Sequence, residues 1–112
     1  MLEIDSKTLT ITISQGDIFD MTFDIEELAL DASAEVYLTV KKDLADKYAI
    51  LLKQCTSVDV EKNQIRVTIE SPEMETLPVG KYYYDLLYKV GKNKRTLCYP
   101  LRLDVVEVVH NE

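Results

Sequence analysis

The chain of 112 residues alternates between apolar and polar residues in about seven separate segments. In the first segment, Lys7 to Ser14, the apolar residues Leu9, Ile11 and Ile13 alternate with threonines and a serine. Successive side chains of a β-strand point to opposite faces, so a period of two predicts a strand with one buried face. The same period predicts strands at residues 18–25, 34–41, 48–53, 64–70, 82–90 and 95–106.

The inward positions of these strands define the expected core. Leu28 and Leu30 interrupt a polar loop at residues 26–33, and we expect both to lie beneath it. The predicted core consists of the apolar members of each alternation: Leu9, Ile11, Ile13, Phe19, Met21, Phe23, Ile25, Val36, Leu38, Val40, Ile65, Val67, Ile69, Tyr82, Tyr84, Leu86, Tyr88, Val90, Leu97, Tyr99, Leu101, Leu103 and Val105.

Two connecting segments carry their own signals. Residues 43–53 fit one face of a helix through Leu44, Tyr48, Leu51 and Leu52, but residues 48–53 also fit a short strand. We favour the strand, because the segment is short and its neighbours are strands. Residues 71–76 are predicted to form one helical turn, capped by Ser71 and with Pro72 at its first position. Residues 56–63 are predicted to be a loop.

The centre of the predicted fold is a β-hairpin. Its first strand, Tyr82 to Val90, is too apolar to lie at a solvent-exposed edge. Glycine, lysine and asparagine at residues 91–94 supply the turn, and Arg95 to Val106 form a long second strand. Pro100 lacks the N–H that a central strand needs, so it should lie at an edge or a bulge.

The run that precedes the hairpin has the composition of a structural corner. After Leu77, Pro78 and Gly80 set a turn, and Tyr82 follows. This run resembles the tyrosine corner of immunoglobulin-like sandwiches, in which the tyrosine hydroxyl bonds to upstream backbone. With no long helix or internal repeat, the pattern predicts an immunoglobulin-like antiparallel β-sandwich of about seven strands. We expect a single domain at residues 1–112, with its core at about 7–106 and a frayed C-terminal tail.

The charge of the chain is negative and unevenly distributed. The formal net charge of −7 argues against nucleic acid and anionic membrane as partners. Residues 1–40 contain nine acidic side chains and one basic one, a net charge of −8, whereas residues 41–112 have a net charge of +1. An acidic half joined to a nearly neutral half with local basic spots suits head-to-tail self-association.

The N-terminus and the cysteines indicate a reducing compartment. The first residues lack the basic and apolar regions of a signal peptide, and no apolar run is long enough to span a membrane. Cys55 and Cys98 are therefore expected to be reduced thiols. Cys98 is also out of phase with the inward positions of its predicted strand.

The sequence offers little for catalysis. His110, the one histidine, lies near the end of the chain, two cysteines do not make a zinc site, and the glycines are scattered. We therefore predict no catalytic, cofactor-binding or metal-ligating residues, no small-molecule substrate, and a protein that is not an enzyme. Asp20 and Asp24 have the spacing of a solvated strand face rather than a calcium loop.

The tyrosines of the hairpin have two interpretations. Tyrosine rings can stack on sugars, but Tyr82, Tyr84 and Tyr88 share a face with Leu86 and Val90. That phasing favours a core or a subunit interface, with the hydroxyls at its rim.

The most specific segment is the run Leu-Pro-x-Gly-x-Tyr-x-Tyr-Asp at residues 77–85. Together with the strand pattern of residues 14–106, it resembles small immunoglobulin-like structural proteins of tailed phages and prophages, similar to the N-terminal domains of baseplate and tail proteins. The resemblance implies a non-catalytic tail or baseplate component that contacts other virion proteins. It also implies a location in the virion, and in the bacterial host cytoplasm before assembly.

Two functions remain in competition at this point. The first is the assembly component, acting as a homo-oligomer or with other tail proteins. The second is a small immunoglobulin-like binding module for a carbohydrate or a host surface protein. For assembly, we predict contacts between the basic tip of the hairpin and an acidic face of the next copy, formed by Lys89, Lys92, Lys94 and Arg95 on one side and Asp20, Asp24 and Glu35 on the other.

Overall fold

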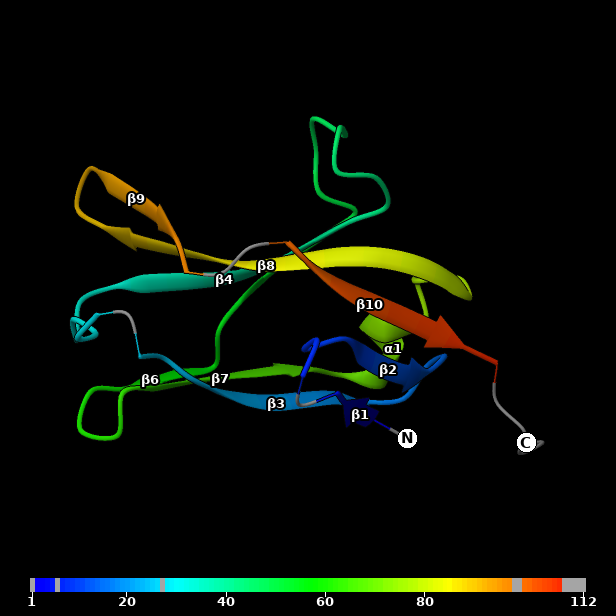
Figure 1. Ribbon diagram of the computed structural model, residues 1–112, viewed down its shortest axis with the longest axis horizontal. Helices are drawn as coiled ribbons and strands as arrows, with labels where there is room; N and C mark the ends of the chain where they lie inside the picture. Colours follow the sequence, from blue (N-terminus) through cyan, green and yellow to red (C-terminus); the bar gives the residue numbers. More distant parts are fainter. Residues whose placement is uncertain (1, 6, 27, 98–99, 108–112) are drawn as a thin grey trace.

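The computed structural model describes residues 2–5, 7–26, 28–97 and 100–107, and it is a mostly-β protein with two sheets (Figure 1). The strands are β1 (Leu2–Ile4), β2 (Ile11–Ser14), β3 (Phe19–Asp24), β4 (Glu35–Lys41), β5 (Leu51–Gln54), β6 (Ser57–Asp59), β7 (Gln64–Ile69), β8 (Gly80–Val90), β9 (Asn93–Thr96) and β10 (Leu101–Val106). The helix in the described part of the chain, α1, is the single turn Ser71–Met74.

The larger sheet has seven strands in the order β1-β2-β10-β8-β4-β5, with β9 also paired to β8. The smaller sheet has three strands in the order β3-β7-β6. The larger sheet is mixed, because β10 runs parallel to β2, with Leu103 opposite Ile11 and Val105 opposite Ile13. The expectation of a purely antiparallel sandwich is therefore wrong at this pair. A period of two predicts a strand but contains no information on the direction of its neighbour.

The core lies between the two sheets, where the inward positions of their strands meet. Alternation is clearest in β4, where Val36, Leu38 and Val40 are at most 1% exposed. Leu30 is buried beneath its loop, as expected. The other fully or almost fully buried apolar residues are Ile11, Ile13, Phe19, Ile65, Val67, Ile69, Met74, Leu77, Tyr82, Tyr84, Leu86, Tyr88, Leu97, Leu103 and Val105.

The first strand was predicted to begin at Lys7, which is too early. Leu9 has a φ of +60° and is exposed, so the strand starts only at Ile11. The cause is a tight turn, in which the Asp5 carboxylate accepts hydrogen bonds from the Lys7 and Thr8 amides and the Leu9 amide donates to the Asp5 carbonyl. Two short strands, β1 and β6, were not predicted, because three residues are too few to show a periodic pattern.

The second strand of the predicted hairpin is divided. β9 pairs with the end of β8, β10 pairs with its beginning, and Pro100 lies in the break between them. A proline cannot donate to the ladder, which accounts for the interruption. At residues 43–53 the strand interpretation is confirmed and the helix is excluded, since residues 51–54 form β5.

The helical turn at residues 71–76 forms, but the predicted cap is wrong. Glu70 occupies the N-cap position of α1, there is no side-chain cap bond, and Pro72 lies in the first turn. The predictions about Cys98, Tyr99 and His110 fall outside the described residues, and so does the predicted frayed tail after Val106, apart from Glu107.

Candidate functional site: the two ends of β8 and the outer sheet face

The predicted corner forms at the start of β8. Tyr82 is 2% exposed, and its hydroxyl donates a hydrogen bond of 2.6 Å to the Pro78 carbonyl, as predicted. Leu77 is buried, and Gly80 begins β8 opposite Val105 of β10. Burial raises the pKa of the Tyr82 hydroxyl, so it is a protonated donor at neutral pH. The corner is thus a closed structural element without an accessible reactive group.

The ring of Tyr82 also has a cationic neighbour. The Lys42 ammonium lies 4.7 Å from the ring centroid of Tyr82 and donates a hydrogen bond of 3.1 Å to the Lys81 carbonyl. A cation above a tyrosine face is attracted to it, so Lys42 fastens the β4–β5 loop to the corner.

The other end of β8 forms a hairpin with β9 whose two faces differ. Tyr88 lies opposite Arg95 and Val90 opposite Asn93, so these four side chains share the inner face. Lys89 lies opposite Lys94 on the outer face. The predicted basic tip is therefore split, with Arg95 on one face, Lys89 and Lys94 on the other, and Lys92 in the turn.

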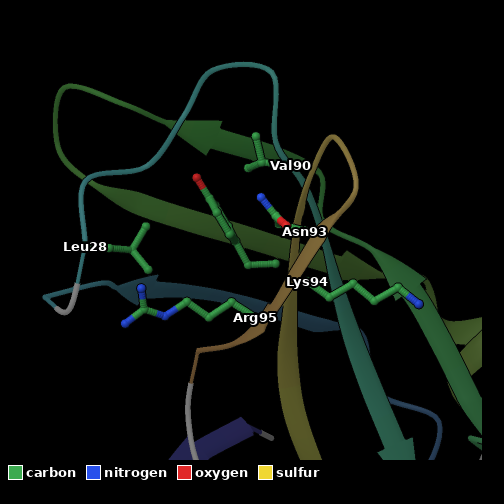
Figure 2. Close-up of a pocket in the computed structure, with 6 residues that line it drawn as sticks. Leu28, Val90, Asn93, Lys94 and Arg95 are labelled. Atoms are coloured by element: carbon green, nitrogen blue, oxygen red, sulfur yellow. The ribbon is translucent and has the colours of Figure 1, made fainter.

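A loop covers part of the inner face of this hairpin. The Asp31 amide donates a hydrogen bond of 2.9 Å to the Tyr88 hydroxyl, which ties the loop at residues 25–34 to β8. Between this loop and the hairpin lies an open pocket of about 340 Å³, which we call the hairpin pocket (Figure 2). Its lining residues are Leu28, Tyr88, Val90, Asn93, Lys94 and Arg95.

The hairpin pocket combines apolar walls with a cation. Figure 2 shows Arg95 extended toward the side where Leu28 lies, whereas Lys94 points the opposite way. Among the residues that the structure describes, no acidic side chain lines the pocket and none forms an ion pair with Arg95. The guanidinium is thus available to a carboxylate brought in from outside.

The predicted acidic residues do not form one face. Asp20, on the smaller sheet, accepts hydrogen bonds of 3.0 and 2.8 Å from Arg66, which lowers the pKa of its carboxyl. Asp24 lies on the same strand and accepts a hydrogen bond of 2.7 Å from the side-chain amide of Gln64. Glu35 is on the larger sheet, directly opposite Lys89. The structure therefore places Glu35 beside the basic hairpin rather than with Asp20 and Asp24.

The outer face of the larger sheet carries partly buried apolar and aromatic side chains. Tyr83 and Leu87 face outward, and Leu87 lies opposite Tyr37. Between them, Asp85 lies opposite Thr39. Desolvation by burial raises the pKa of the Asp85 carboxyl, although Lys41 and a hydrogen bond with Thr39 oppose the rise.

The edge of the same sheet was not predicted as a contact surface. Along β5 and the loop before it, four large apolar residues are exposed: Leu44 (55%), Tyr48 (77%), Ile50 (48%) and Leu52 (57%). The sequence does indicate this exposure, because apolar residues occur at successive positions of residues 48–53, so a strand there would have apolar side chains on both of its faces. A solvent-exposed, apolar edge strand is a template for pairing with another chain.

At the corner end, a smaller group of apolar residues is exposed, namely Ile18 (47%), Val79 (46%) and Val106 (39%). The Gln15 amide donates to the Val106 carbonyl, and the Gln15 side chain donates to the Leu77 carbonyl. These bonds bring together the segments that carry the three residues. Sequence reasoning placed Ile18 at the start of a strand without recognising its exposure.

Chemistry at Cys55 is suppressed. Its thiol is free, as predicted, and burial raises its pKa to about 12, so it is protonated at neutral pH and a poor nucleophile. Among the described residues there is no cluster of histidine, cysteine and acidic side chains that could hold a metal ion, and no helix that could span a membrane.

Comparisons of the chain with protein families, with curated proteins and with solved structures found no match.

Proposed function

We propose that this protein is a non-catalytic structural component that assembles through protein–protein contacts. One observation carries the proposal: four large exposed apolar residues, from Leu44 to Leu52, lie along the β5 edge of the larger sheet and the loop before it. Exposed apolar groups of this kind mark interaction surfaces more often than they mark catalytic clefts. The outward residues Tyr37, Tyr83 and Leu87 extend the surface across the sheet.

We further propose an immunoglobulin-like arrangement and a role in the tail or baseplate of a tailed phage or prophage. The two-sheet architecture and the bond from Tyr82 to Pro78 support the fold, because a corner of this kind recurs in such sandwiches. The support for the virion role is the resemblance carried by the run at residues 77–85. On this proposal the partners are further copies and other tail proteins, in the virion and, before assembly, in the host cytoplasm.

The alternative function is a binding module for a carbohydrate or a host surface protein. The hairpin pocket is the observation that favours it, since it offers a tyrosine, apolar walls and polar donors in one hollow. A binding module of this kind has no need to self-associate.

Sedimentation velocity over a wide range of protein concentration tests the proposal. We expect a discrete ring or oligomers that grow with concentration, and we expect Leu52→Lys to weaken them because lysine protects sheet edges from pairing. Val60→Lys is the matched control, since Val60 is 46% exposed but lies outside β5 and the loop before it. A strict monomer at every concentration would favour the binding module.

A further inference from the structure

The chemistry of the hairpin pocket limits what it can accept. Its volume of about 340 Å³ lies at the low end of the range for ligand sites, roughly 300–1,000 Å³. Leu28, Tyr88 and Val90 favour an apolar group, and Arg95 favours a carboxylate beside it. The best occupant is therefore an aliphatic side chain with acidic neighbours.

The chain exposes such a group elsewhere. Ile18 is 47% exposed and stands between Asp17 and Asp20, within the half of the chain that has a net charge of −8. Asp20 is paired with Arg66, and Asp17 already interacts within its own chain. What attracts Arg95 is therefore the net negative charge of this segment, not an unpaired carboxylate.

The two features lie toward opposite ends of the molecule. The hairpin of β8 and β9 and the turn between β2 and β3 are separated along the longest axis in Figure 1, over which the protein extends 44 Å. A contact between them cannot form within one copy. Between copies it would be heterologous, and repetition of such a contact closes a ring or grows a filament.

We propose that Ile18 of one copy enters the hairpin pocket of the next, with the acidic segment around it facing Arg95. This inference rests on the proposed assembly function and specifies where two copies meet. Apolar burial in the pocket supplies most of the affinity, whereas the charges set orientation and encounter rate. Self-association therefore weakens as salt is added.

The test uses two variants that damage one side of the contact each. Arg95→Glu reverses the charge in the pocket, and Lys62→Glu is its matched control, because Lys62 is an exposed cation that does not line the pocket. Ile18→Ser removes the aliphatic group, and Val60→Ser, at a similarly exposed site, is its control. All four residues are exposed, so each variant should melt at the wild-type temperature, which circular dichroism checks.

Sedimentation is then measured for each variant alone and for the mixture of Arg95→Glu with Ile18→Ser. We expect each of the two to raise the dissociation constant about tenfold or more, and each control to leave it nearly unchanged. The mixture should associate more tightly than either variant alone, because the intact Ile18 of the first variant meets the intact pocket of the second.

Two results would overturn the inference in different ways. If the wild type associates and both Arg95→Glu and Ile18→Ser associate as tightly as the wild type, the contact lies elsewhere, for instance along β5. The proposed assembly function would then be retained. If the wild type is monomeric at every concentration, the proposed assembly function and this contact both fail.

Discussion

The two ends of β8 obey the same alternation but have different environments. At the corner end, Tyr82 is covered on its inner side, its hydroxyl is bonded to Pro78, and β10 pairs with residues 80–84 of the strand. At the hairpin end, every residue of β9 is exposed, and the inner face opens into the hairpin pocket. One strand can therefore serve the core at one end and present a contact surface at the other.

The cause of the difference is what covers the inner face. At the corner end the inner face is covered by the core, in which Tyr82 and Leu77 are at most 2% exposed. At the hairpin end the cover is a loop, held by the bond between the Asp31 amide and the Tyr88 hydroxyl and by Leu28. A loop leaves gaps that a packed strand would fill, and these gaps form the pocket.

The largest expected effect comes from removing a ring at the closed end. Tyr82→Ala should lower the free energy of unfolding by about 3–5 kcal/mol, because it leaves a cavity in the core. Val90→Ala, at the open end, should cost about 1 kcal/mol or less, since Val90 is only partly buried. Urea denaturation measures both values. Equal losses at the two positions would show that the ends of β8 are equally packed.

A subtler change isolates the corner hydrogen bond. Tyr82→Phe keeps the ring and should cost about 1 kcal/mol, the net contribution of a typical hydrogen bond. Tyr83→Phe is the control, because Tyr83 faces outward on the same strand. If Tyr83→Phe destabilised the protein as much in the same urea titrations, the bond to Pro78 would not be what fixes the corner.

The corner and the core were predictable because both depend on local sequence. The hydroxyl of Tyr82 reaches only four residues back along the chain, and the alternation in β4 and β8 follows from burial of one face. The parallel pairing of β2 with β10 and the meeting of Leu28 with Arg95 join distant segments. No local pattern specifies such contacts, so the hairpin pocket could not be predicted.

The exposure of particular apolar residues could not be predicted from the sequence either. A period of two identified Ile18 and Leu52 as strand or strand-flanking residues, but the exposed fraction depends on which strand lies next to them. β5 is the last strand of its sheet, and that position follows from the whole topology.

Between the two ends, Asp85 provides a pH-dependent test. Its folded-state pKa is raised by burial above the ordinary value of 3.8, so its favourable contribution to stability is full below that pH and is lost as the pH rises through the folded pKa. Asp85→Asn should therefore raise the urea midpoint at neutral pH, with no gain below pH 3.8.

Asp20→Asn should lower the urea midpoint at neutral pH, the opposite of the effect of Asp85→Asn. The reason is that Arg66 lowers the pKa of Asp20 and stabilises its charged form. That contribution is present above the unfolded pKa and is lost as the pH falls through the folded pKa. A gain in stability for Asp20→Asn at neutral pH would contradict the assignment of this ion pair.

The smallest effect on stability is expected at the open end. Arg95→Gln should change the free energy of unfolding by no more than about 0.5 kcal/mol, as is usual for exposed positions without a partner. Its effect should appear instead in self-association, measured by sedimentation on the same sample. If Arg95→Gln unfolded at a clearly lower urea concentration and associated like the wild type, Arg95 would stabilise the fold rather than make a contact between copies.

Hydrogen exchange as a function of protein concentration can show whether the corner end of β8 maintains the fold while the hairpin end makes contacts between copies. We expect backbone amides of β9 and of the turn before β3 to exchange more slowly as the protein concentration rises. The amides around Tyr82 should be protected at every concentration, because they are closed within one copy. If exchange in β9 stayed unchanged across a concentration range in which the protein associates, the hairpin end would not be a contact between copies.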